Sequence, residues 1–458
     1  MSITPLEFAR GNAEVYRNQL FELLRIPSIS TMPEHNDDVR RAAEWLMANM
    51  KQLGMQTAEL LPNDGHPAVY GEWLGAGPDA PTILVYGHYD VQPAVLADGW
   101  SNPPFEPVIR NGVIYARGAS DDKGQMFTHL KALEAFLATE GHAPVNVKYL
   151  IEGEEEIGSP NLGSLLSTHK ARLVADVCVI SDTGMAAMDN PAITYALRGL
   201  AYMELHVTGP KRDLHSGLGG PVHNPALALS QIIAQLHNAD GSVAVPGFYD
   251  DVLPLDADER AALREIELDA AAFIRETGIP AVWGEPGYTL IERQTARPTL
   301  EINGLLSGFT GAGSKTVLPA KAMAKISCRL VANQDPERIY QQVRAFVQQI
   351  TPPTVRTELR YLNGGTPALV DRNLPAMQAA ISAFERGWGA APSFRRSGGT
   401  IPVVADFARE LNIPSILMGF GLESDGAHGP DEHLSVEMFH RGIATSICFM
   451  EALAEKGR

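Results

Sequence analysis

Cysteine is scarce in this chain, and the few cysteines lack the spacing of a metal-binding or redox motif. Cys178, Cys328 and Cys448 are the only three in 458 residues, and no two of them form a C-x-x-C pair. A sparse, odd-numbered set indicates buried free thiols in a reducing compartment rather than a disulfide framework. We therefore expect a cytoplasmic protein.

Long apolar runs and a surplus of basic residues are also missing. No stretch of about 18 apolar residues occurs, so the sequence predicts no membrane-spanning helix, and the N-terminal segment has no apolar signal-peptide core. The 37 Lys and Arg against 54 Asp and Glu give a formal net charge of −17. Nucleic acids and anionic membranes attract basic surfaces, so we expect neither as a partner.

The first half of the chain alternates between strand patterns and helix patterns. Short apolar or alternating runs typical of strands occur at 82–87, 145–151, 176–181 and, late in the chain, 414–421. Apolar residues at helical spacing predict helices at 37–53, 124–138 and 435–455. Strands separated by helices indicate an α/β domain with a mostly parallel central sheet.

The middle of the chain has a different order of elements. Strand patterns are found at 200–209, 299–304, 322–331 and 354–362. Asn224-Pro225 opens a helix after the first of these strands, and Asp335-Pro336 opens another after the third. This is the β-α-β-β-α-β order of a ferredoxin-like α+β unit. The sequence therefore predicts a discontinuous α/β domain at 1–196 and 366–458, interrupted by an α+β domain at 197–365.

Polar side chains gather at the carboxyl ends of the predicted strands, where open α/β sheets bind their ligands. They are His88, Asp90, Asp121, Asp122, Glu154, Glu155, Glu156, Asp182, Asp425 and His428. Carboxylates converging on one cleft would repel one another unless a cation neutralised them. Imidazole with carboxylate suits Zn²⁺, with Mn²⁺ or Co²⁺ as alternatives. Five ligand groups with one shared carboxylate would suit two ions about 3.5–4 Å apart.

Several segments resemble one superfamily of zinc-dependent dipeptidases, glutamate-releasing carboxypeptidases and N-acyl-amino-acid deacylases. They run in family order over nearly the whole chain and include YGHYDVQP (86–93), GASDDKG (118–124), EGEEEIGS (152–159), DLHSG (213–217), GSKTVLP (313–319), SGGTIP (397–402) and GAHGPDE (426–432). The chain is most similar to the cytosolic non-specific dipeptidase and carnosinase branch. The resemblance implies dinuclear-metal hydrolysis of dipeptides or small peptides that have a free C-terminal carboxylate. The alternative is a deacylase of N-acyl amino acids or a carboxypeptidase of the same superfamily.

The resemblance implies five metal ligands. His88 and Asp182 would bind one ion, and Glu156 and His428 would bind the other. Asp121 would bridge the two ions. The second domain would then act as a lid and dimerisation domain, as it does in relatives.

The resemblance also implies three catalytic side chains. Glu155 would be the general base, because the family pattern EE-x-GS makes it the first of the paired glutamates and leaves Glu154 at a variable position. Asp90 would orient His88 through the other ring nitrogen. His215 of DLHSG would stabilise the oxyanion from the partner subunit, so we expect a homodimer.

Four further residues would bind the substrate. In relatives, the position of Arg329 pairs with the C-terminal carboxylate of the substrate. Gly399 and Thr400 of SGGTIP would add a backbone N–H and a hydroxyl at the same end, although the branch usually has Ser where Thr400 stands. Thr316 of GSKTVLP would approach the site of the neighbouring subunit.

Overall fold

The chain folds into two compact units. The computed structural model describes residues 3–185, 187–399 and 401–456. Unit 1 comprises Met1–Tyr195, Val370–Arg395 and Asp406–Arg458, and unit 2 comprises Ala196–Leu369 and Arg396–Ala405. The segment Arg396–Ala405 lies within the range that we expected in the catalytic domain. It belongs to unit 2, where Arg396 forms an ion pair with Glu259.

Unit 1 is built on a mixed sheet, which corrects the expectation of a mostly parallel one. Four central strands run parallel in the order β6-β3-β7-β18: β6 (Asn146–Glu152), β3 (Thr82–His88), β7 (Val177–Ile180) and β18 (Ser415–Met418). Antiparallel strands flank them: β1 (Thr57–Leu61) and β2 (Ala68–Trp73) beside β6, and β9 (Ala192–Leu197) beside β18. The parallel part agrees with the sequence, because helical crossovers connect its first three strands.

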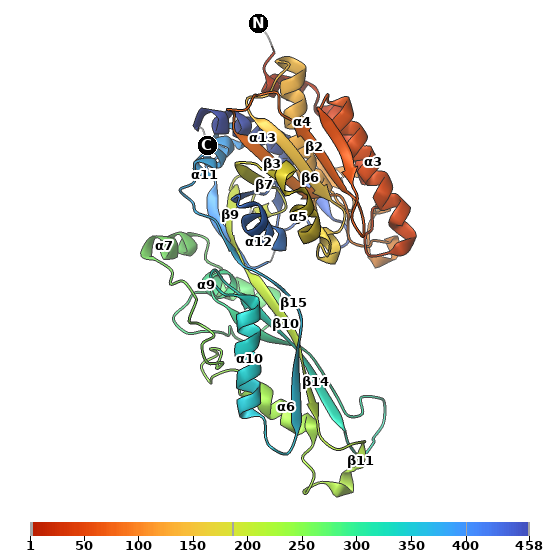
Figure 1. Ribbon diagram of the computed structural model, residues 1–458, viewed down its shortest axis with the longest axis vertical. Helices are drawn as coiled ribbons and strands as arrows, with labels where there is room; N and C mark the ends of the chain where they lie inside the picture. Colours follow the sequence, from red (N-terminus) through yellow and green to blue (C-terminus); the bar gives the residue numbers. More distant parts are fainter. Residues whose placement is uncertain (1–2, 186, 400, 457–458) are drawn as a thin grey trace. The chain divides into compact units, whose positions relative to one another are not determined.

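Helices cover this sheet (Figure 1). They are α1 (Pro5–Gly11), α2 (Ala13–Leu24), α3 (Asn36–Gln52), α4 (Lys123–Thr139), α5 (Leu162–Leu173), α11 (Pro375–Ala383) and α13 (Val436–Lys456). Helix α3 contacts β1 and β2, whereas α4 contacts β3 and is covered by α13. Almost every residue of the first three turns of α4 is buried, so its polar side chains must find partners inside the unit.

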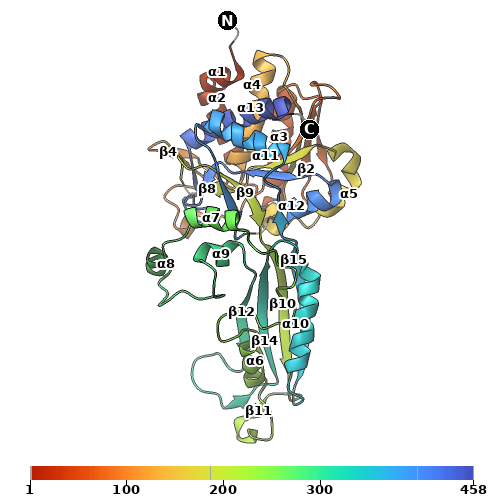
Figure 2. The ribbon, with the colours of Figure 1, turned by 90° about the vertical axis from the view of Figure 1, so that its left-hand side faces the viewer.

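Unit 2 contains a four-stranded antiparallel sheet in the order β12-β14-β10-β15. The strands are β10 (Gly199–Thr208), β12 (Thr299–Ser307), β14 (Lys321–Leu330) and β15 (Arg356–Gly365). Helices α6 (Pro225–Ala234) and α10 (Pro336–Ile350) pack on it, in the expected β-α-β-β-α-β order (Figure 2). Between α6 and β12 lie three more helices, α7 (Ala257–Glu265), α8 (Ala270–Thr277) and α9 (Leu290–Thr295).

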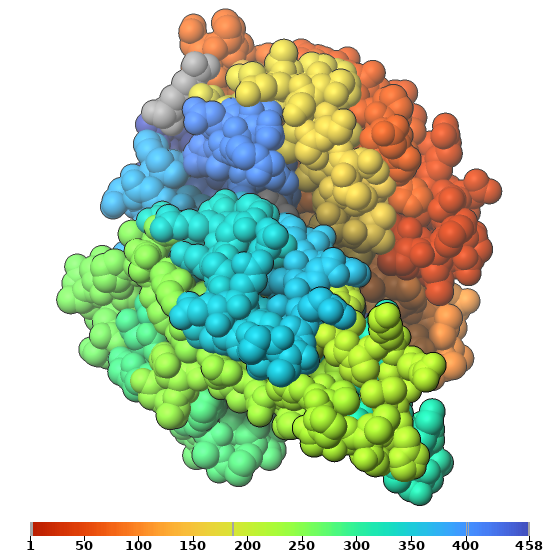
Figure 3. All heavy atoms as spheres, turned by 60° about the horizontal axis from the view of Figure 1, so that its bottom comes forward, coloured from red at the N-terminus to blue at the C-terminus, as the bar shows by residue number. Residues whose placement is uncertain are grey.

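The core of unit 2 follows from strand and helix periodicity. Along β10, every second residue is buried, from Ala201 to Val207, and these side chains face α6 and α10. Ile339, Val343 and Val347 form the buried stripe of α10, and the outer side of this helix is visible in cyan in Figure 3. No helix in the described part of the chain is long and apolar enough to cross a membrane.

Candidate metal centre

Strands of unit 1 deliver the expected polar residues to one edge of the sheet. β3 ends at His88, and Asp182 follows the parallel strand β7. β6 ends at Glu152, and Glu155 and Glu156 follow after two intervening residues in a single 3-10 turn, Glu155–Ile157. Asp121 lies just before α4, which packs on β3. The carboxyl ends of parallel strands meet at the same edge, so these side chains come together.

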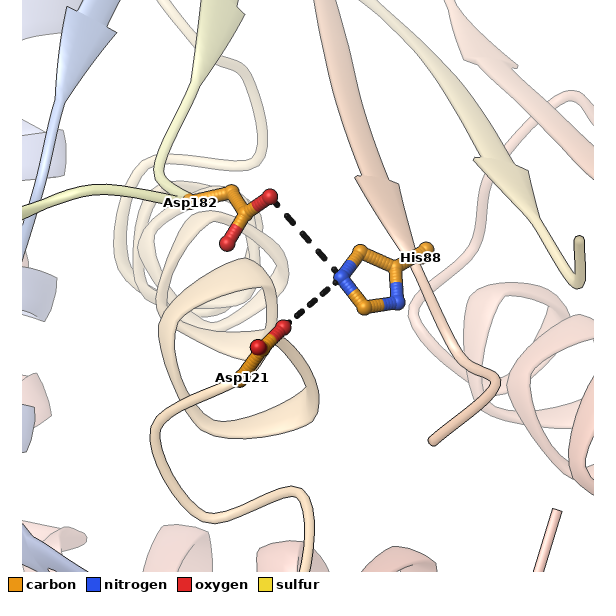
Figure 4. Close-up of side chains that lie close together, drawn as sticks. All are labelled: His88, Asp121 and Asp182. Carbon is orange, nitrogen blue, oxygen red and sulfur yellow. Dashed lines mark ion pairs between the residues drawn. The ribbon is translucent and has the colours of Figure 1, made fainter. Parts of the chain in front are cut away.

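The first cluster joins His88, Asp121 and Asp182 (Figure 4). Nε2 of His88 lies 3.0 Å from Oδ1 of Asp121 and 3.9 Å from Oδ2 of Asp182. The His88 ring is fully buried, and no described residue makes a well-formed hydrogen bond with its Nε2. A buried imidazole nitrogen that faces two carboxylates fits a bound cation, which would satisfy all three groups.

The second cluster joins Asp121, Glu156 and His428. Nε2 of His428 lies 2.9 Å from Oδ2 of Asp121 and 3.2 Å from Oε2 of Glu156. Asp121 therefore belongs to both clusters and turns one carboxylate oxygen toward each histidine. Within each cluster the candidate ligand atoms all lie within 4.8 Å of one another. Two three-ligand groups that share one carboxylate are the donor set expected for a pair of divalent ions.

The electrostatics of these clusters favour positive charge. Contacts with Asp121 and Glu156 raise the pKa of His428 to about 10. Burial alone would lower the pKa of His88, but its contacts with Asp121 and Asp90 outweigh that effect and raise it. Metal binding needs neutral imidazole and ionised carboxylate, so a divalent cation would compete with the protons that these imidazoles attract.

The three consecutive glutamates have different surroundings. Glu154 is buried and accepts hydrogen bonds from the side-chain amide of Asn161 at 3.0 and 3.1 Å, so its carboxylate is already used. Glu156 accepts a hydrogen bond from Nε2 of Gln92 at 2.7 Å and belongs to the second cluster. Burial and the charges of neighbouring carboxylates raise the pKa of Glu155 to about 8. These surroundings support the register in which Glu155 is the base and Glu156 the ligand.

Asp90 contacts both His88 and the glutamate turn. It is fully buried, and its Oδ1 lies 3.4 Å from Nδ1 of His88, whose closer neighbour is the main-chain oxygen of Asp90 at 3.1 Å. The carboxylate also accepts the backbone N–H groups of Glu155 (3.3 Å) and Glu156 (3.1 Å) and the hydroxyl of Ser30 (2.7 Å). Asp90 therefore connects the end of β3 to the glutamate turn.

Two of the expected residues of unit 2, His215 and Thr316, lie together at a small two-stranded sheet. β11 (Leu214–His215) pairs with β13 (Val317–Leu318), and the backbone N–H of Ser216 donates to the carbonyl of Thr316. His215 is exposed, and its Nδ1 accepts the N–H of Gly217 at 3.0 Å. In the neutral ring, the proton is therefore on Nε2, which is free to donate to a ligand.

The other two described residues lie near Arg198, which sequence reasoning missed. Nε of Arg198 donates to the carbonyl of Gly398 at 2.9 Å, and its backbone N–H donates to Gly399 at 2.9 Å. Burial and the nearby charge of Arg329 lower the pKa of Arg198 to about 10. Two neighbouring guanidinium groups beside a glycine turn suit an anionic ligand group. Thr400 lies outside the described residues.

Comparison with known proteins identifies the family. The sequence matches the peptidase family M20/M25/M40 over residues 84–452. The chain belongs to this family. The Cys-Gly metallodipeptidase DUG1 of Saccharomyces cerevisiae is 31% identical over 96% of this chain and 95% of its own. The human Beta-Ala-His dipeptidase is 30% identical over 93% of this chain and 87% of its own.

A solved structure agrees with this assignment. The M20 family metallo-carboxypeptidase Sso-CP2 from Sulfolobus solfataricus superimposes with a TM-score of 0.83 at 33% identity, covering 95% of this chain and 98% of the other. The predicted likeness to the dipeptidase and carnosinase branch is confirmed, and the chain is a metallopeptidase. Membership implies divalent metal ions, for which the two clusters supply candidate ligands.

Proposed function

We propose that this metallopeptidase is a dinuclear dipeptidase, which hydrolyses the amide bond of dipeptides or small peptides with a free C-terminal carboxylate. The observation that carries the proposal is the pair of ligand clusters that share Asp121. The names of two relatives support the substrate class, since one denotes action on Cys-Gly and the other on Beta-Ala-His. A cytoplasmic location is consistent with the buried free thiols.

Five side chains would hold the ions. His88 and Asp182 would bind one, Glu156 and His428 the other, and Asp121 both. Zn²⁺ suits this mixture of imidazole and carboxylate best, with Mn²⁺ or Co²⁺ as alternatives. When bound, such ions polarise the substrate carbonyl and lower the pKa of a coordinated water.

Glu155 would move the proton. Its raised pKa, about 8, suits a group that accepts a proton from water near neutral pH and returns it to the leaving amine. Asp90 would fix the position of Glu155 through the backbone N–H that it accepts. A carboxylate held in this way needs little rearrangement between the two proton transfers.

In a homodimer, the unit 2 domains of both subunits would contribute residues to one substrate-binding site. Arg329 pairs with Leu200 on β10, whereas Lys321, close to the small β11–β13 sheet, pairs with Thr208. The eight residue-to-residue steps from Leu200 to Thr208 span roughly 26 Å of strand. Figure 1 shows β11 at that distant end of β14. A dipeptide is too short to touch both ends, so Arg329 and His215 would serve one substrate only if they come from different subunits.

The two ends would have different tasks. Arg329 would pair with the C-terminal carboxylate of the substrate, beside the N–H of Gly399 and the hydroxyl of Thr400. His215 of the partner subunit would donate Nε2–H to the oxyanion. Thr316, immediately before β13, lies beside it in the same chain.

A dipeptide panel tests the proposal. The protein would be treated with a chelator, supplied with Zn²⁺ or Mn²⁺, and assayed as wild type, Glu155→Gln and Glu154→Gln. We expect metal-restored hydrolysis in the wild type, a loss of about 10²–10⁴-fold in Glu155→Gln, and activity retained in Glu154→Gln, whose carboxylate contacts Asn161 instead. Hydrolysis that survives chelation in every protein would contradict a metal mechanism.

The same assay separates the second candidate function. Sso-CP2 is described as a carboxypeptidase, which favours longer peptides as an alternative substrate class. N-acetyl amino acids, N-carbamoyl amino acids and tripeptides would be assayed beside the dipeptides. Faster turnover of these compounds than of any dipeptide would replace the dipeptidase assignment with a deacylase or carboxypeptidase.

A further inference from the structure

The buried carboxylate of Glu432 faces the main chain of the segment that leads into Asp121. Glu432 is fully buried and accepts four N–H groups. Oε2 accepts Nη1 of Arg117 at 2.7 Å and the backbone N–H of Gly118 at 3.0 Å. Oε1 accepts the backbone N–H groups of Ser120 at 2.9 Å and Asp121 at 3.0 Å. An ionised carboxylate can accept about four hydrogen bonds, so these donors saturate it.

Glu432 extends a strand pairing toward Asp121, which both ligand clusters share. β20 (His433–Ser435) pairs with β5 (Val113–Tyr115), and the pairing ends at His433 opposite Tyr115. Beyond that point the carbonyl of Glu432 still accepts the N–H of Ala116 at 3.1 Å. From residue 117 to Asp121, four N–H groups donate to the side-chain carboxylate of Glu432 instead. The side chain of Glu432 therefore supplies acceptors for the backbone before Asp121 where the strand pairing has ended.

The loop from Asp425 to Glu432 carries His428, and its Asp425 end is also attached to the segment before Asp121. The hydroxyl of Ser120 donates to Oδ2 of Asp425 at 3.2 Å. His428 lies between Asp425 and Glu432 in the sequence, and both of these carboxylates are attached to the segment that leads into Asp121. The separation between Asp121 and His428, 2.9 Å at their closest atoms, is thus set by two contacts that flank the loop.

We propose that Glu432 is the positioning residue that holds Asp121 between the two metal ions, so that it controls the affinity for both. This inference rests on the proposed dinuclear site. Glutamine has the same shape, but its amide nitrogen cannot accept a hydrogen bond. Glu432→Gln would leave one pair of N–H donors without an acceptor and would shift the backbone of Asp121 or Gly118.

Zinc titration of the metal-free protein tests this assignment. Wild type and Glu432→Gln would be titrated in competition with a chromophoric chelator, and thermal unfolding of the metal-free proteins would report stability separately. A matched control is Glu292→Gln in unit 2, since Glu292 is also fully buried and accepts the guanidinium of Arg260 and the N–H of Thr289. We expect both variants to unfold at lower temperature, but only Glu432→Gln to bind both ions roughly 10–100-fold more weakly.

Each outcome has a defined meaning. A wild type that binds fewer than two ions would overturn the proposed function. Wild-type affinities in Glu432→Gln, weakening of one ion only, or equal weakening in Glu292→Gln would overturn this inference alone. If Glu432→Gln does not fold, Arg117→Gln decides, since it removes one of the four donors and keeps the carboxylate. Weaker binding of both ions in that variant supports the inference, and unchanged binding overturns it.

Discussion

Acid should destabilise this protein through His129, whose imidazole is buried between hydroxyl groups. His129 lies on α4, with Nε2 2.7 Å from Oγ of Ser181 and Nδ1 3.1 Å from Oγ of Ser446. Ser181 donates its own proton to the carbonyl of Met418 at 2.7 Å, so Nε2 must donate to Ser181. In the neutral ring, Nδ1 accepts the hydroxyl proton of Ser446, for which the carbonyl of Gly442 at 2.9 Å competes. Burial lowers the pKa of His129 to about 3.

The sign and size of the effect follow from the two states. In the unfolded chain, histidine titrates near 6.5, so between pH 6.5 and 3 the unfolded state binds one proton more than the folded state. The stabilisation is complete above pH 6.5 and is lost as the pH falls. The limiting slope is about 1.4 kcal/mol per pH unit, and lowering the pH from 7 to 5 should cost about 2 kcal/mol.

Urea unfolding of wild type and His129→Gln at pH 7 and pH 5 measures this term. A chelator in both buffers removes the contribution of metal binding, and the effect of other titrating groups cancels in the difference between the proteins. Glutamine keeps hydrogen-bonding groups toward Ser181 but does not titrate. The wild type should lose about 2 kcal/mol more than the variant. Equal losses in the two proteins would refute the reasoning.

Three further predictions concern the site. Glu156→Gln should release one of two zinc ions and keep the other, as metal analysis after dialysis would show; loss of both would contradict separate clusters. Arg329→Met should raise KM for dipeptides roughly tenfold or more with a smaller change in kcat, because a charge-assisted contact contributes about 1.5–3 kcal/mol; steady-state kinetics would reveal an unchanged KM if the residue has no such role. Mixing and refolding His215→Ala with Glu155→Gln should restore about a quarter of wild-type activity through heterodimers with one intact site, whereas a mixture as inactive as its components would reject a shared site.

Most regular elements could be predicted from local patterns, and the pairing of the outer strands could not. The apolar run at 82–87 became β3, and the Asn224-Pro225 signal became the first turn of α6, capped by the Asn224 side chain. The run at 145–151 alternates in sequence, yet every residue of β6 is buried, because β6 lies between β2 and β3 under covering helices. Strand direction depends on neighbours distant in sequence, so antiparallel β2 had no local signal.

The site shows the same division between local and long-range information. Motifs at strand ends pointed to both clusters, since His88 and Asp182 each follow a buried strand. Gln92 lies within the recognised YGHYDVQP segment, but nothing in that segment shows that its amide holds Glu156. The hydrogen bonds that Glu432 accepts could not be predicted, because their donors are more than 300 residues away in the sequence.

Acidic residues near this site differ in what faces them, and that difference separates candidate ligands from supports. Asp121 and Glu156 turn carboxylate oxygens toward imidazole nitrogens. Asp90 and Glu432 are more deeply buried, and both accept backbone N–H groups of the very residues that face the histidines. Exchanging a ligand should remove an ion, whereas exchanging a support should move a ligand that is still present. Metal stoichiometry and metal affinity therefore answer different questions about the same cluster of acids.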